Sequence, residues 1–239
     1  MLNDLRAVIA GAQGVLFDFD GPICRLFSGH SVPTMAADLV NWLESRGLHG
    51  LLTEEERQFP DPLVILRAVD RRHPHSDLVA ELEERMTQQE LRAVQTAFPT
   101  PYAEPLIRTW AAMGARLAIA TNNSPRTVQA YLNSRGLSEV FDPHIYGRTV
   151  DLSLLKPHPH VVNRALNALG MPPDRALMIG DTPSDVMASR QAGVPFLGYV
   201  RNESRLQALN AAGAELTVTS LDPVLQLLRG LSDQAPVPR

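Results

Sequence analysis

Short apolar runs and amphipathic stretches alternate through most of this chain. The apolar runs are typical of buried strands that end at polar residues, and they lie at residues 14–20, 115–123, 175–181 and 194–200. Stretches with helical spacing separate or follow them, at residues 125–136, 159–170, 184–193 and 203–213. Strands that alternate with helices favour a parallel sheet with helices on both faces. The predicted fold class is therefore α/β.

Residues 23–99 break this alternation. Helical patterns occupy residues 35–48, 61–72 and 77–98, and no convincing apolar strand lies between them. We interpret this region as an all-helical insertion after the first strand. The insertion leaves residues 1–22 and 100–230 for the α/β core, and we expect residues 231–239 to form a flexible tail.

Composition narrows the class of protein. The 239 residues suffice for one well-buried α/β domain with an insertion. A net charge of −4 gives no basic excess that would suggest nucleic acid, and no apolar stretch of about 18 residues suggests a membrane span. The single cysteine, Cys24, cannot form an intramolecular disulfide, and no long apolar run precedes Phe17, so we expect a cytoplasmic protein. The oligomeric state is left open.

Polar residues that could take part in binding or catalysis lie at or near the ends of the apolar runs. In an open parallel sheet, ligands bind beyond the carboxyl ends of the strands, so these positions are the candidates for a site. They are Asp18, Asp20, Thr121, Asn122 and Asp181, to which we add Lys156 just before the helix at 158 and Asp185 one helical turn after Asp181.

Asp18 and Asp20 are spaced so that both carboxylates lie on one face if the strand persists. Like charges this close need a cation or a shared proton, and Mg²⁺ prefers carboxylate and carbonyl oxygens. Asp18 can then attack phosphorus as a nucleophile, while Asp20 acts as the acid and base. Thr121, Asn122 and Lys156 are predicted to hold the phosphoryl oxygens.

Lys156 is the only lysine in the chain, because every other Lys or Arg position is arginine. Where a site needs a compact ammonium on a flexible stem, the planar guanidinium of arginine replaces lysine poorly. The placement of Lys156 among the other candidates supports a catalytic role over chance survival.

Four segments carry a family resemblance. FDFDGPI at 17–23, ATNN at 120–123, LKPHP at 155–159 and IGDTPSD at 179–185 resemble, in order and spacing, the motifs of the haloacid dehalogenase (HAD) superfamily. The resemblance implies a Rossmann-like core with a helical cap inserted after the first motif. It also implies a metal site for Mg²⁺, with the following ligands: Asp18, Asp20 through its backbone carbonyl, Asp181, and Asp185 through water or as a partner of Lys156.

Structural explanations compete with these roles. Asp18 and Asp20 could form a turn, and Asp181 could belong to a helix cap in which Thr182 is the N-cap residue. Three further residues, Arg25, His30 and Arg148, are candidates for substrate contact but are equally well explained as surface residues.

The predicted function is that of a Mg²⁺-dependent phosphatase, a phosphoric monoester hydrolase acting on a small-molecule phosphate ester through an aspartyl-phosphate. Asp20 argues against a dehalogenase, and the lack of any lysine in the cap argues against a phosphonatase that forms a Schiff base. The alternatives are a phosphomutase of the β-phosphoglucomutase type and a non-catalytic module that binds a phosphorylated ligand.

Overall fold

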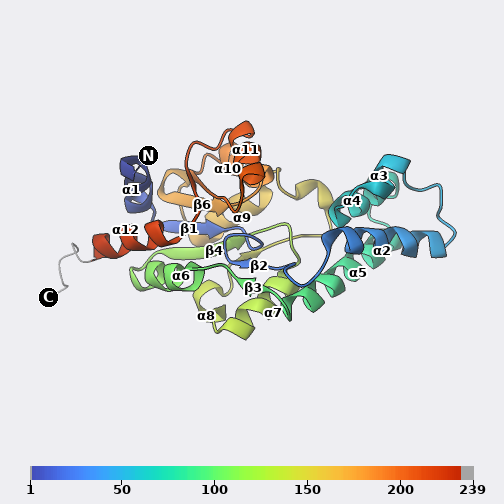
Figure 1. The fold of residues 1–239 in the computed structure, drawn as a ribbon, viewed down its shortest axis with the longest axis horizontal. Coiled ribbons are helices and arrows are strands. Elements are labelled where there is room, and N and C mark those ends of the chain that lie inside the picture. Colours follow the sequence, from blue (N-terminus) through green and yellow to red (C-terminus); the bar gives the residue numbers. More distant parts are fainter. Residues whose placement is uncertain (1, 233–239) are drawn as a thin grey trace.

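A central sheet organises the computed structural model, which describes residues 2–232 (Figure 1). Its six strands are all parallel and run in the order β5-β4-β1-β6-β7-β8. The strands are β1 (Gly14–Phe17), β4 (Arg116–Ala120), β5 (Ile145–Tyr146), β6 (Ala176–Gly180), β7 (Phe196–Tyr199) and β8 (Thr217–Val218). The predicted α/β class and Rossmann-like parallel sheet are confirmed.

Helices cover both faces of the sheet because alternate side chains of each buried strand point to opposite sides. Val15 and Phe17 pack with one set of helices, whereas Leu16 between them packs with the other. The first set is α1 (Leu2–Gly11), α6 (Ala103–Ala112), α7 (Pro125–Arg135), α8 (Ser138–Phe141) and α12 (Asp222–Ser232). The second set is α9 (His160–Leu169) and α10 (Pro183–Ala192). The remaining elements of this part are α11 (Glu203–Ala211) and the 3₁₀ helices η1 (Leu152–Leu154) and η2 (Pro173–Arg175).

Four helices stand beside the sheet at one end of the molecule (Figure 1). They are α2 (Val32–Ser45), α3 (Glu54–Gln58), α4 (Pro62–Arg72) and α5 (Asp77–Val94). Apolar faces of α2, α4 and α5 enclose a hydrophobic core of their own, to which Leu152 and Leu155 also contribute. These helices match the predicted insertion, although its role as a separate cap domain stays a prediction.

The predicted insertion is not all-helical, contrary to expectation. At its two ends β2 (Cys24–Arg25) and β3 (Phe98–Pro99) pair antiparallel. Two-residue strands are too short to produce an alternating pattern in the sequence. The pair brings the start and the end of the insertion together beside the sheet.

The predicted tail is also partly wrong. Leu231 packs against the core and belongs with Ser232 to α12, because the apolar face of this helix continues to that point. Residues 233–239 lie outside the described residues. Within residues 2–232, no helix has the length and apolar character that crossing a membrane requires.

Candidate active site

The carboxyl ends of β1, β4 and β6 lie side by side, and each is followed directly by a candidate residue. Asp18 follows β1, Thr121 follows β4 and Asp181 follows β6. A cavity of about 220 Å³ opens at this edge. Its lining comprises Asp18, Asp20, Phe27, Val32, Asp61, Pro62, Leu63, Met86, Thr121, Asn122, Asn123, Lys156, Asp181, Thr182, Ser184 and Arg205.

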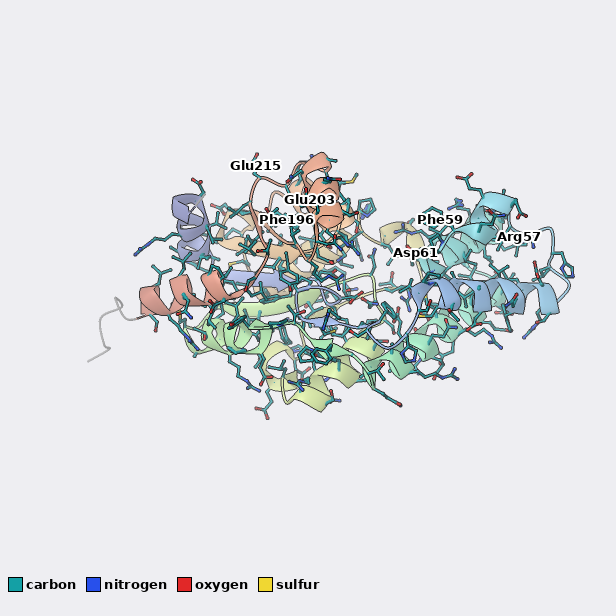
Figure 2. The ribbon with its side chains drawn as sticks, in the orientation of Figure 1. Arg57, Phe59, Asp61, Phe196, Glu203 and Glu215 are labelled. Carbon is teal, nitrogen blue, oxygen red and sulfur yellow. The ribbon has the colours of Figure 1, made fainter. Side chains whose placement is uncertain are left out.

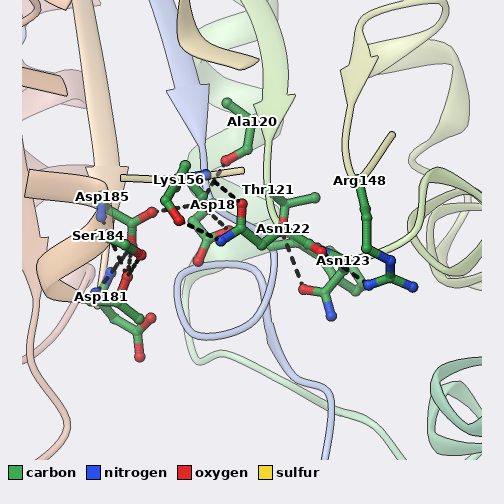
Figure 3. Close-up of polar contacts among 12 residues, drawn as sticks. Asp18, Ala120, Thr121, Asn122, Asn123, Arg148, Lys156, Asp181, Ser184 and Asp185 are labelled. Carbon is green, nitrogen blue, oxygen red and sulfur yellow. Dashed lines mark hydrogen bonds and ion pairs between the residues drawn. The ribbon is translucent and has the colours of Figure 1, made fainter. Parts of the chain in front are cut away.

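Lys156 lies between two carboxylates at the base of this cavity (Figure 3). Its Nζ is 2.8 Å from Oδ1 of Asp18 and 2.5 Å from Oδ1 of Asp185, and it donates to the carbonyl of Ala120 at 2.9 Å. Burial alone would lower the pKa of Lys156, but the charges of Asp18 and Asp185 outweigh it and raise that pKa. The ammonium therefore stays charged beside Asp18.

Asp18 is almost completely buried, at 6% exposure. Burial and the negative charge of Asp185 raise the pKa of Asp18 to about 6, against the opposing effect of Lys156. A bound cation would favour the charged form of Asp18 and so would lower the pKa of Asp18 again.

Asp181 adds a second buried carboxylate. Carboxylate oxygens of Asp18, Asp181 and Asp185 all lie within 4.8 Å of one another. Burial, with the charges of Asp18 and Asp185, raises the pKa of Asp181 to about 7. Its Oδ2 pairs with Arg201 at 3.0 Å, whereas its buried Oδ1 has no hydrogen-bond partner among the described residues. An unpartnered buried oxygen in such a cluster fits a hard divalent cation.

Asp185 connects the segment at Asp181 and Thr182 to Lys156. Its Oδ2 accepts hydrogen bonds from the Asp181 and Thr182 amides at 3.2 and 3.0 Å and from the Thr182 hydroxyl at 2.7 Å. Thr182 is the N-cap of α10, as the sequence indicated, and forms a capping box with Asp185. Since Oδ1 of Asp185 lies 2.5 Å from Nζ of Lys156, its contacts favour the role as partner of Lys156 over that of a metal ligand through water.

Two glycines allow these carboxylates to approach one another. Gly21 has a φ of +124°, and a Cβ there would lie 2.6 Å from Oδ1 of Asp181. At Gly180 a Cβ would lie 2.6 Å from the Cβ of Asp185. Any side chain at either position would displace a carboxylate of the site.

Asp20 lines the same cavity but does not contact Lys156 through any described hydrogen bond. Its Oδ1 accepts the Leu26 amide at 2.8 Å. Burial raises the pKa of Asp20 and outweighs the opposing effect of that hydrogen bond. A raised pKa suits a carboxyl group that must hold a proton before it donates one.

Thr121 and Asn122 shape the loop that follows β4. The Asn122 side chain accepts the Lys156 amide at 2.8 Å and donates to the Lys156 carbonyl at 3.0 Å. The Thr121 hydroxyl donates to Oδ1 of Asn123 and accepts the Asn123 amide. The Asn122 side chain therefore fixes the backbone of Lys156, and a role of the Asn122 backbone N–H with phosphate stays a prediction.

A buried ion pair beside this loop was missed by the sequence analysis. Glu90 of α5 lies 2.8 Å from Nη1 of Arg148, and both side chains are fully buried. Arg148, which Figure 3 shows beside Asn122 and Asn123, also donates to the Asn122 carbonyl at 3.0 Å. Glu90 accepts the Ser124 amide at 3.0 Å. The pair therefore joins the insertion to the loop after β4. Glu90 gave no signal because an acidic residue on an amphipathic helix ordinarily faces water.

The three candidates for substrate contact lie elsewhere. Arg148 forms an ion pair with Glu90, and Arg25 stacks over the Phe98 ring. Nδ1 of His30 is 3.1 Å from the Thr96 hydroxyl. None of the three lines the cavity.

Two arginines that contact Asp181 were also missed, and one of them, Arg205, lines the cavity. Arg201 contacts the Asp181 carboxylate, and Arg205 donates to the Asp181 carbonyl at 3.4 Å. Arg201 directly follows the fourth apolar run, so the strand-end rule applied there would have found it.

Comparisons with known proteins place the chain in a family. The haloacid dehalogenase-like hydrolase family matches residues 12–193. Phosphoglycolate phosphatase of Rhodospirillum rubrum is 37% identical over 105 residues, 42% of this chain and 43% of that enzyme. Phosphoglycolate phosphatase of Pseudomonas savastanoi is 30% identical over 200 residues, 80% of this chain and 71% of that enzyme.

A solved structure of similar fold is a predicted phosphatase from Clostridium acetobutylicum, with a TM-score of 0.65 and 20% identity over 92% of this chain and 97% of that one. The phosphatase class of the relatives agrees with the enzyme class expected from the sequence, phosphoric monoester hydrolase. The match to residues 12–193 spans more than half of the chain, and the chain therefore belongs to the haloacid dehalogenase-like hydrolase family.

Proposed function

We propose that this protein hydrolyses a small phosphate monoester, with Mg²⁺ and with an aspartyl-phosphate formed on Asp18. The observation that carries the proposal is the contact between Asp18 and Lys156. It lies next to Asp181, whose buried Oδ1 has no hydrogen-bond partner among the described residues. A nucleophilic carboxylate, a fixed cation and a second carboxylate for metal meet at one strand edge.

The residues that would hold the metal are Asp18, Asp181 and the backbone carbonyl of Asp20. When bound, Mg²⁺ supplies positive charge that offsets the charge of these carboxylates and of the phosphoryl group. Lys156 supplies a second, permanent positive charge to Asp18 from the protein side. With both positive charges present, Asp18 can stay ionised while a dianionic ester binds next to it.

In the first step, a carboxylate oxygen of Asp18 forms a bond to phosphorus as the bond from phosphorus to the alcohol oxygen breaks. Asp20 gives its proton to that departing oxygen, so the alcohol leaves neutral. The phosphoryl oxygens lie against Thr121, Asn122 and Lys156.

In the second step, Asp20 is a carboxylate and takes a proton from water. The water oxygen bonds to phosphorus, the bond from phosphorus to the Asp18 oxygen breaks, and inorganic phosphate leaves. Asp20 has its proton again, so the cycle closes without any other reactant.

The helical insertion, residues 23–99, is proposed to act as a cap that contacts the leaving group, because Asp61 and Met86 of the insertion line the same cavity as Asp18. Two relatives are named phosphoglycolate phosphatase, which makes phosphoglycolate one substrate to test. A cytoplasmic location stays a prediction.

The test is phosphate release from p-nitrophenyl phosphate and a panel of metabolite monoesters, with Mg²⁺ or with EDTA. Wild type should release phosphate only with the metal, and Asp18→Asn, of nearly equal size, should release none while unfolding at a similar temperature. Equal release by Asp18→Asn would refute the proposal. Recovery of phosphate on another hydroxyl of the substrate would indicate a phosphomutase instead.

A further inference from the structure

The insertion contributes one wall of the cavity, and that wall is mostly apolar. We call it the cap wall; its residues are Phe27, Val32, Asp61, Pro62, Leu63 and Met86. Within the described residues, the carboxylate of Asp61 is the one charged group of this wall. Since the phosphoryl group belongs at Asp18, the leaving group lies toward the cap wall.

Local structure holds Asp61 in place. It is the N-cap of α4, and its Oδ1 accepts the Leu63 amide at 2.8 Å. Among the labelled residues Arg57, Phe59 and Asp61, Asp61 lies nearest to the sheet in the view of Figure 2. The cap bond engages Oδ1, so a donor on the ligand can approach Oδ2.

Nearby positive charges do not cancel Asp61 for a ligand in the cavity. Arg67 interacts electrostatically with Asp61, but it donates to the Lys156 carbonyl at 2.9 Å and lines a different cavity. Arg205 lines the same cavity, but from α11 on the core side, where it donates to the Asp181 carbonyl at 3.4 Å. The N-terminus of α4 carries only about half a positive charge, less than the full negative charge of Asp61.

We infer that Asp61 selects a leaving group that donates a hydrogen bond and carries no negative charge, such as a hydroxyl-bearing alcohol, over one that carries a carboxylate. The inference rests on the proposed function. A carboxylated leaving group such as glycolate would face Asp61 without a cation on the cap wall. A hydroxyl group would instead donate to Oδ2, and its carbon chain would contact the apolar side chains.

The experiment compares kcat/KM for two monoesters of similar size, hydroxyethyl phosphate and phosphoglycolate, at saturating Mg²⁺. Wild type should prefer hydroxyethyl phosphate by roughly tenfold or more, which corresponds to about 1.4 kcal/mol. In Asp61→Asn the amide oxygen can still cap α4, so only the charge is lost.

Asp61→Asn should raise kcat/KM for phosphoglycolate by roughly tenfold and lower that for hydroxyethyl phosphate by about threefold, because a charged acceptor becomes a neutral one. Asp70→Asn is the matched control, because it removes an equal charge from α4 outside this cavity. It should leave the ratio of the two values as in wild type.

A wild-type preference for phosphoglycolate would overturn the inference, and so would a ratio that Asp61→Asn shifts no more than Asp70→Asn. If folded wild type releases phosphate from p-nitrophenyl phosphate with Mg²⁺ but does not discriminate between the monoesters, only the specificity inference fails. If it releases none from any ester, the proposed function fails, and the inference fails with it.

Discussion

Glu90→Gln tests whether the buried pair with Arg148 stabilises the protein and fixes the loop after β4, which is proposed to bind phosphate. Glu90 has no exposed surface and accepts hydrogen bonds from Arg148, Ser124 and Thr127 at 2.8, 3.0 and 3.0 Å. Burial alone would lower the pKa of Arg148, but the charge of Glu90 raises it in the wild type. After the substitution the guanidinium still stays charged, because arginine keeps its proton in proteins. Glutamine therefore leaves a buried cation without its closest counter-charge.

Removal of one partner from a buried pair costs about 3–5 kcal/mol. Arg148 keeps Glu83 at 3.0 Å, so we expect the lower end of that range. A loss of about 3 kcal/mol lowers the unfolding temperature by roughly 6–12 °C in a protein of this size. Because Arg148 also holds the Asn122 carbonyl, KM for p-nitrophenyl phosphate should rise more than kcat falls.

Thermal unfolding followed by circular dichroism measures the first effect, and steady-state kinetics measures the second. The control is Glu83→Gln, which removes the more exposed partner of Arg148 and should cost at most about 1 kcal/mol. If Glu90→Gln is no less stable than Glu83→Gln, the reasoning about the buried pair is wrong.

Three further predictions concern the carboxylate cluster. Lys156→Arg should lower kcat/KM for p-nitrophenyl phosphate at least about 100-fold, since a planar guanidinium cannot replace the ammonium between two carboxylates; near wild-type kinetics would exclude this. In EDTA, stability should fall as pH rises from about 4 to 7, because raised pKa values of Asp18 and Asp181 mean that the folded protein binds more protons than the unfolded chain. Added Mg²⁺ should then raise the unfolding temperature more at pH 8 than at pH 5, and equal shifts would contradict this account. Gly21→Ala is strained at positive φ, and its Cβ would overlap the Asp181 carboxylate. In a metal titration it should raise the Mg²⁺ concentration that gives half-maximal activity by roughly tenfold, and an unchanged midpoint would refute the steric argument.

The sequence was sufficient for the core and for most of the residues at the strand ends. Asp18 and Asp181 interrupt or end apolar runs, and parallel strands bring such positions to one edge. Lys156 follows no strand, but its uniqueness in the chain singled it out. None of these signals depends on a contact between distant segments.

The parts that were missed depend on contacts between distant segments. Asp61 looks like an ordinary helix cap in the sequence, and its place in the cavity arises only when α4 packs beside the sheet. The position of Glu90 in its helical pattern is typical of a solvent-facing residue, and only the packing of α5 beside Arg148 buries it. The strands β2 and β8 have two residues each, so neither has a detectable period.

A phosphoryl group on Asp18 is the central claim, and a rapid acid quench during turnover tests it most directly. Wild type is mixed with Mg²⁺ and an active monoester, quenched, digested and examined by mass spectrometry, with Asp18→Asn treated in parallel. The account predicts that the wild-type peptide containing Asp18 gains the mass of one phosphoryl group, which hydroxylamine removes, and that the variant peptide gains nothing. Turnover with the phosphoryl group on a different residue would contradict the account.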